Sequence, residues 1–139
     1  MVRMNRKVEY VLMALKVIAQ KKPGELTSAK EIVEGTGCPS DATARVLQKM
    51  AHHGILKSEQ GASGGYILVR ELPKLTLYEL MELILGPIAA SKCLQGQGGC
   101  DLLDKCNIVT PMAVLNKKFQ DFYQGVSVGE LLRVREHEQ

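Results

Sequence analysis

Long apolar runs are missing from this chain of 139 residues, so no stretch is long and apolar enough to span a membrane. Internal repeats and low-complexity tracts are missing too, which excludes a repeat architecture. The opening residues, 1–7, lead into an amphipathic segment rather than an apolar one, so they predict no signal peptide. We therefore expect a cytoplasmic protein with no membrane partner.

A strong excess of charge of one sign is also absent. The formal net charge is +3, which permits nucleic-acid binding but does not by itself argue for it. The position of the cations is more informative, because Arg45, Lys49 and Lys57 fall close together while the acidic residues lie largely elsewhere. Apolar residues make up 45% and charged residues 24%, which is typical of a soluble globular protein.

Groups that would mark an enzyme are missing as well. The sequence has no nucleophile and base in a recognisable arrangement, no phosphate-binding loop and no pair of carboxylates placed for acid–base work. Close cysteine pairs, which structural zinc sites usually hold, are not found between residues 86 and 107. We expect neither an enzyme nor a structural zinc site.

What the first half does contain is a pattern of short helices followed by a hairpin. Apolar residues at steps of three and four predict a helix over about residues 6–20. Ser28 with Glu31 forms a capping box that opens a second helix, and Pro39-Ser40 starts a third that Gly54 stops. Strand-like runs at 55–59 and 66–70 surround a glycine-rich turn. Residues 1–75 are thus predicted to form a winged helix-turn-helix DNA-binding domain, mainly α with a small β-hairpin.

The second half, residues 76–139, is predicted to hold a functional loop and the dimerisation helices, in one compact unit with the first helix shared. A second capping box at Thr76 opens a helix that Gly86 ends, and residues 86–107 form a long irregular segment. Thr110-Pro111 is predicted to start a long helix. Its apolar residues have little to cover in so small a domain, which suggests a partner helix; they are Met112, Leu115, Phe119 and Phe122.

The third helix is expected to enter the major groove, because a recognition helix presents its N-terminal residues to base edges. Glycines in the hairpin let its tip approach a phosphate backbone closely. The alternative is a helical hairpin with a solvated charged face and an ordinary turn. The expected DNA-binding residues are Ser40, Asp41, Thr43, Arg45 and Lys49 on the helix, and Gln60, Gly61 and Ser63 on the wing.

Three cysteines, Cys93, Cys100 and Cys106, share the irregular segment at intervals of six and then five residues. A cytoplasmic protein rarely keeps a disulfide, and three is an odd number. Thiolates select zinc, copper(I) or iron–sulfur clusters, and a cluster needs a further ligand from elsewhere. Three free thiols in a flexible loop are the alternative. Cys38 stands alone before the third helix and is expected to be a buried side chain.

Four segments in the right order resemble the IscR/NsrR-type winged-helix regulators of bacteria. They are residues 5–10, the wing residues 61–66, the three cysteines and residues 126–132. The resemblance implies a homodimer held by the long helix and a palindromic double-stranded DNA operator. It also implies an iron–sulfur cluster, 2Fe–2S or 4Fe–4S, on Cys93, Cys100 and Cys106, whose state changes DNA affinity.

The chain departs from these regulators at three places. The first cysteine interval is six residues where five is usual, and Gln60 stands where many members carry a basic residue. In IscR-like members a histidine three residues past the last cysteine completes the site, but here that residue is Val109. In nitric-oxide-sensing members an acidic residue on the partner's first helix does so, and it matches Glu9. We take Glu9 as the fourth ligand, with Asp101, Asp104 and Asn107 as rivals.

Two other functions stay open at this stage. One is a regulator of the same fold without a cluster, which acts through thiol oxidation or a partner protein and requires accessible, low-pKa cysteines. The other is an electron-transfer protein that merely carries a cluster, but a winged helix would then serve no purpose. The cluster-controlled transcription regulator, which senses iron, redox or nitric oxide status, is the function we expect.

Overall fold

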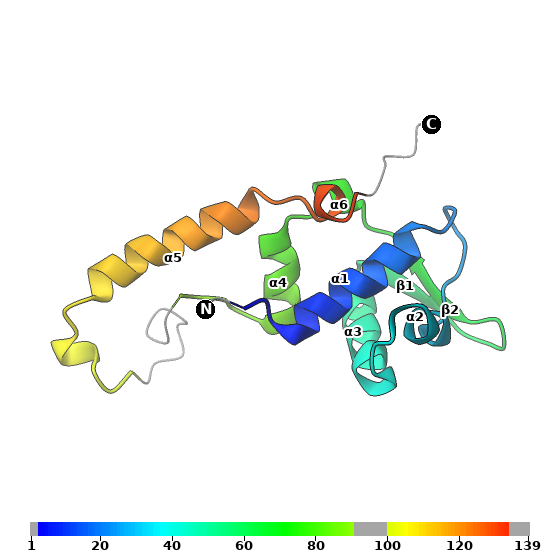
Figure 1. Cartoon of the computed structure of the whole chain (residues 1–139), viewed down its shortest axis with the longest axis horizontal. Helices are drawn as coiled ribbons and strands as arrows, with labels where there is room; N and C mark the ends of the chain where they lie inside the picture. Colours follow the sequence, from blue (N-terminus) through cyan, green and yellow to red (C-terminus); the bar gives the residue numbers. More distant parts are fainter. Residues whose placement is uncertain (1–2, 91–99, 134–139) are drawn as a thin grey trace.

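The computed structural model describes residues 3–90 and 100–133, and its first half is a winged helix-turn-helix (Figure 1). The fold expected from the sequence, mainly helical with one hairpin, is confirmed. Three helices precede the hairpin: α1 (Arg6–Ala19), α2 (Ala29–Thr36) and α3 (Ser40–His52). The described part of the chain contains no helix with the length and apolarity needed to cross a membrane.

Capping residues begin and end the first two helices, including Ser28, which the sequence predicts. Asn5 caps α1 by accepting a hydrogen bond from the Lys7 N–H, and Ser28 caps α2 by accepting one from the Glu31 N–H. Gly37 ends α2 with φ 75°, a left-handed conformation that suits glycine. Only three residues, Gly37 to Pro39, separate α2 from α3, which makes the tight turn of the helix-turn-helix.

The hydrophobic core lies where α1 crosses α3 and α4 (Leu77–Leu85). Side chains from both halves of the chain meet in this one cluster, so the predicted boundary at residue 75 runs through a shared core. Burial of apolar surface on this scale is the main stabilising force of the fold. The largest fully buried side chains include Leu15, Ile32, Leu47, Met50, Ile55, Leu72, Leu80 and Ile84.

The wing is an antiparallel pair, β1 (Leu56–Glu59) and β2 (Gly65–Leu68), in which Leu56 faces Leu68 and Glu59 faces Gly65. Thr27 adds an isolated bridge to Tyr66, which ties the wing to the chain before α2. At the tip Gly61 has φ 115°, which L side chains rarely adopt. The tip therefore depends on a glycine there.

The chain returns to the winged helix at its end. The 3₁₀ helix η1 (Leu72–Lys74) leads into α4, and the last helix, α6 (Val128–Leu131), packs on η1. The Leu77 N–H donates to the Val126 carbonyl and the Val128 N–H to the Leu75 carbonyl, both at 2.8 Å. Ser127 caps α6, as its sequence predicts, by accepting from the Glu130 N–H.

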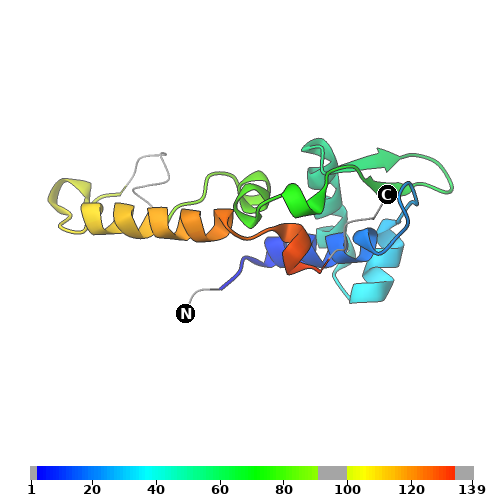
Figure 2. The ribbon, with the colours of Figure 1, turned by 90° about the horizontal axis from the view of Figure 1, so that it is seen from above.

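Between α4 and α6 lie η3 (Leu103–Lys105) and the long helix α5 (Val109–Gln124). The predicted start, with Thr110 as the cap and Pro111 as the first helical residue, is wrong by two residues, since α5 begins at Val109 and Pro111 is its third residue. Proline fits there because the first-turn N–H groups have no partner inside the helix. Figures 1 and 2 show α5 projecting away from the winged helix, with η3 at its far end.

Candidate functional site

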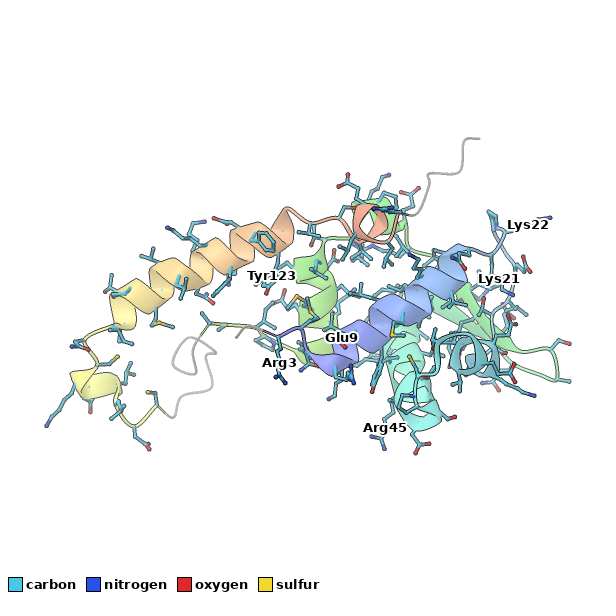
Figure 3. All side chains as sticks on the ribbon, viewed as in Figure 1. Arg3, Glu9, Lys21, Lys22, Arg45 and Tyr123 are labelled. Carbon is cyan, nitrogen blue, oxygen red and sulfur yellow. The ribbon has the colours of Figure 1, made fainter. Side chains whose placement is uncertain are left out.

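One face of α3 is free to meet a ligand. Ser40 and Asp41 at its start and Arg45 in its second turn are all exposed. Val46, Leu47 and Met50 take the opposite, buried side, as the sequence predicts. Figure 3 shows Arg45 pointing away from α1. The exposed face of α3 thus carries hydroxyl, carboxylate and guanidinium groups, which are chemically suited to base edges and phosphates.

Thr43 does not belong to this face, so the expectation that it contacts DNA is wrong. Its side chain is 1% exposed, on the buried side of α3. The Thr43 hydroxyl makes no hydrogen bond within the described part of the chain. Thr43 stands three, four and seven residues before Val46, Leu47 and Met50, so the helical repeat places it on their buried side. A prediction that assigns the whole first turn of α3 to DNA overlooks this.

Lys49 lies one turn after Arg45, but its ammonium group is engaged inside the chain. Its Nζ donates to the Ile84 carbonyl, in the last turn of α4, at 2.6 Å. Carbonyls in the last turn of a helix lack partners within the helix, and a cation there is favourable to the helix dipole. In this structure Lys49 therefore links α3 to α4.

The wing tip offers backbone rather than charge. Gln60, Gly61 and Ser63 are exposed, and residues 60–65 contain no cation. A Cβ on Gly64 would stand 2.6 Å from the Glu59 carbonyl oxygen, so the turn is closed too tightly for a side chain there. A contact between this tip and a phosphate would use N–H groups and the Ser63 hydroxyl.

The cysteine segment, residues 86–107, precedes α5 in the chain. Cys100 and Cys106 are free thiols, both half-buried; Cys106 directly follows η3 and Cys100 stands three residues before it. The Leu103 N–H donates to the Cys100 carbonyl at 3.2 Å and the Cys106 N–H donates to the Leu103 carbonyl at 3.4 Å, so two successive turns of chain separate the two residues. Cys93, the third predicted ligand, lies outside the described residues.

The thiols of Cys100 and Cys106 are the right kind of ligand for a metal cluster, but two thiols alone do not make a complete site. Among residues 3–90 and 100–133, no three His, Cys, Asp or Glu side chains form a metal-binding group. Two soft thiolates six residues apart, Cys100 and Cys106, suit an iron–sulfur cluster. The remaining ligands would have to come from Cys93 and from another element. Asp101, Asp104 and Asn107 are exposed beside them.

Glu9 lies in the first turn of α1, where its side chain is 40% exposed. Its Oε2 accepts from Arg6 at 2.9 Å, and this hydrogen bond raises the pKa of Arg6. In one chain the carboxylate is thus paired with an exposed arginine, Arg6. An exposed ion pair of this kind separates at little cost, so Glu9 is available to another ligand.

Two further residues, Cys38 and Asn116, bear on the cysteine site. Cys38 is 4% exposed and its thiol contacts the Met13 sulfur at 3.7 Å, which confirms the expectation of a buried side chain. Asn116 on α5 accepts a hydrogen bond from the Ala90 N–H at 2.7 Å and so holds the start of the cysteine segment. The sequence analysis missed Asn116, because a single asparagine on a long helix carries no signal of its own.

A winged helix with a polar reading face on α3 defines a DNA-binding transcription regulator as the class of this protein. Residues 4–134 match the Rrf2 family, described as an iron-dependent transcriptional regulator, and the chain belongs to this family. The resemblance expected from the sequence is therefore confirmed at the level of the family. Its relatives are transcriptional regulators, which are not enzymes.

Similar proteins include two HTH-type transcriptional regulators by sequence and the cysteine regulator CymR by structure. The HTH-type regulator IscR of Escherichia coli O1:K1 / APEC is 24% identical over 134 residues, 96% of this chain and 82% of its own length. An HTH-type regulator assigned in Aquifex aeolicus (strain VF5) is 26% identical over 131 residues, 93% of this chain and 90% of its own. The structure of CymR, the global cysteine regulator of B. subtilis, matches with a TM-score of 0.72 and 19% identity. The match covers 98% of this chain and 100% of the CymR chain.

Proposed function

We propose that this protein is a cytoplasmic, homodimeric regulator whose affinity for a palindromic operator is controlled by an iron–sulfur cluster. Cys93, Cys100 and Cys106 hold the cluster, and Glu9 of the partner subunit supplies the fourth ligand. The observation that carries the proposal is the pair of free, half-buried thiols, Cys100 and Cys106, on either side of η3 in the segment that also contains Cys93. When bound, the group supplies one-electron redox chemistry and a site for small diatomic ligands.

The geometry of one chain supports a ligand from a second subunit. The helix η3, which Cys106 follows, lies at the end of α5 that is remote from the winged helix (Figure 2). The described part of a single chain brings no carboxylate or histidine together with Cys100 and Cys106 as a metal-binding group. A partner's α1 is an element that presents an exposed carboxylate, Glu9, in its first turn.

The surface of α5 supports the dimer. Apolar residues that recur every seven positions are exposed on it, and together with Met112 and Phe119 they form one stripe. Heptad spacing is the pattern by which two helices pack along a seam. No residue of α5 is buried in the single chain. The exposed members of the stripe are Ile108 at 51%, Leu115 at 40% and Phe122 at 65%.

The experiment is an absorption spectrum of anaerobically purified protein, with iron and sulfide analysis. Cys93→Ala, Cys100→Ala and Cys106→Ala should each abolish visible colour and leave a folded dimer. Cys38→Ala is the matched control, because Cys38 is buried in the winged helix, and it should keep the colour. Iron and sulfide at parental levels in the three loop variants would contradict the assignment.

Glu9 is tested separately. Glu9→Ala should shift the spectrum or shorten the lifetime of the cluster, because one iron would lose its protein ligand. Arg6→Met is the control, since it removes the ion pair at 2.9 Å but keeps the carboxylate. Mixed dimers of Glu9→Ala subunits and subunits without the three cysteines should hold one intact site at most. A parental spectrum and lifetime in Glu9→Ala would assign the ligand elsewhere, with Asp101, Asp104 and Asn107 next to test.

A second candidate is a thiol-based regulator of the same fold. It is favoured by the likeness to the cysteine regulator CymR and by the partial exposure of Cys100 and Cys106. In this case the protein would be colourless, and hydrogen peroxide would oxidise one thiolate to a sulfenic acid with release of hydroxide. Operator affinity would then change with peroxide in the absence of any iron, and Cys100→Ala or Cys106→Ala would remove the change.

A further inference from the structure

The hydrogen bond between Lys49 and α4 joins the DNA-reading helix to the element that leads into the cysteine segment. The Ile84 carbonyl that accepts it stands two residues before Gly86, which ends α4. The Gly86 N–H closes the last turn of α4 by donating to the Glu82 carbonyl at 2.8 Å. A change in the course of the chain at Gly86 therefore acts directly on the carbonyl that holds Lys49.

The segment after Gly86 is itself held from α5. The Asn116 side chain accepts from the Ala90 N–H at 2.7 Å, and Ile88 packs against the core. Residues 86–90 are thus fixed at one end by the last turn of α4 and at the other by α5. Residues 86–90 therefore connect α4 to the part of the chain that contains the three cysteines.

We propose that Lys49 is a positioning residue that sets the orientation of α3 relative to α4 and so passes the state of the cysteine segment to the reading face. Its ammonium group has three donors, one of which the Ile84 carbonyl takes. While this bond is made, α3 is held in a fixed relation to α4. When the last turn of α4 opens, Lys49 is released and Arg45, one turn earlier, loses its fixed position.

This inference deepens the proposed function and rests on it in one respect, that the cysteine segment controls DNA affinity. The sequence predicts a different role for Lys49, that of a direct contact with DNA, which for a lysine would neutralise a phosphate. The two roles predict different salt dependence. A phosphate contact releases counterions, so its loss flattens the slope of log affinity against log salt by roughly two units per dimer. A positioning contact leaves the slope as it was.

The first test uses Lys49→Met, which keeps the aliphatic stem, and Lys49→Arg, which keeps a donor. Binding to a duplex recovered by selection from a random-sequence library is followed by fluorescence anisotropy over a salt series. We expect Lys49→Met to bind more weakly with an unchanged salt slope, and Lys49→Arg to restore much of the affinity. A slope flattened by roughly two units per dimer would overturn the positioning role in favour of phosphate contact.

The second test is independent of any metal or DNA. Loss of a hydrogen bond from a charged donor shifts a local equilibrium by roughly tenfold, so amide exchange in the last turn of α4 should accelerate by about that factor in Lys49→Met. Unchanged exchange would overturn the inference. Because free protein suffices, this result stands even if the cluster proposal fails.

A double-mutant cycle measures the transmission itself. Asn116→Ala frees the Ala90 N–H, and its effect on DNA affinity should be large in the parent and smaller in the Lys49→Met background. Additive effects of the two substitutions would show that residues 86–90 and Lys49 act independently, which overturns the inference. A colourless parent protein with a preserved coupling would instead count against the cluster proposal alone.

Discussion

Arg45 is an exposed cation on the reading face of α3, the face that also carries Ser40 and Asp41, and its side chain is not part of the buried side of the helix. If it reads a guanine, Arg45→Ala should relax sequence preference at a cost of about 1–3 kcal/mol per half-site. The measurement is anisotropy with a selected and a scrambled duplex. Lys118→Ala, an equal loss of charge on α5, is the control and should leave the preference unchanged. A parental ratio of affinities in Arg45→Ala would remove Arg45 from the reading face.

Lys21 joins the end of α1 to α2 through its contact with Glu31 at 2.7 Å. This hydrogen bond lowers the pKa of Glu31 and raises that of Lys21. Because the folded-state pKa of Glu31 is lowered, its contribution is present above the unfolded value and is lost as the pH falls through the folded one.

Lys21→Met should therefore lower the urea midpoint at neutral pH, and the difference from the parent should shrink in acid, once Glu31 is protonated in both states. Lys22→Met is the matched control, since Lys22 is the exposed neighbour outside this ion pair (Figure 3). A difference that is the same at neutral and acid pH would mean that the lost lysine acts through packing rather than charge.

At the scale of the element, α6 is held on η1 by close backbone contact. Gly129 is buried, and a Cβ there would stand 2.5 Å from the Pro73 nitrogen and 2.7 Å from its Cα. Gly129→Ala should destabilise the fold by about 1–3 kcal/mol, because the two elements must separate. Gly125→Ala is the control, with its nearest contact at 3.4 Å. Equal unfolding midpoints for the two variants would contradict the close packing of α6.

The elements could be predicted from the sequence wherever a local signal sets them. Caps at Ser28, Thr76 and Ser127 define helix starts because each hydroxyl bonds to an N–H three residues on. The start of α5 has no side-chain cap, and there the prediction was off by two residues.

The candidate site was less predictable. Whether Thr43 faces DNA or the core depends on the rotation of α3, and whether Lys49 is free depends on the position of α4. These are tertiary facts that no local pattern encodes. The choice between a cluster and free thiols depends on a ligand set that spans distant elements, which spacing alone does not fix.

At the scale of the whole molecule, the exposed stripe on α5 makes a prediction about assembly. Phe122→Glu places a charge among apolar residues that are exposed in the single chain, so it should convert the dimer to a monomer in sedimentation velocity and weaken DNA binding. Gln124→Glu adds the same charge at an exposed polar position of α5 and should remain dimeric. A dimeric Phe122→Glu would move the interface away from this stripe.

The projection of α5 has a geometrical consequence for operators. With 16 residues it is about 24 Å long, so a tilt of about 10° at its base moves its far end by about 4 Å. In a dimer joined along α5, the crossing angle of the two helices sets the spacing of the two reading helices. DNA presents equivalent groove faces only about every 34–36 Å. A rotation of a few degrees between subunits is therefore enough to decide whether both half-sites are met in phase with the helical repeat of DNA or only one of them is.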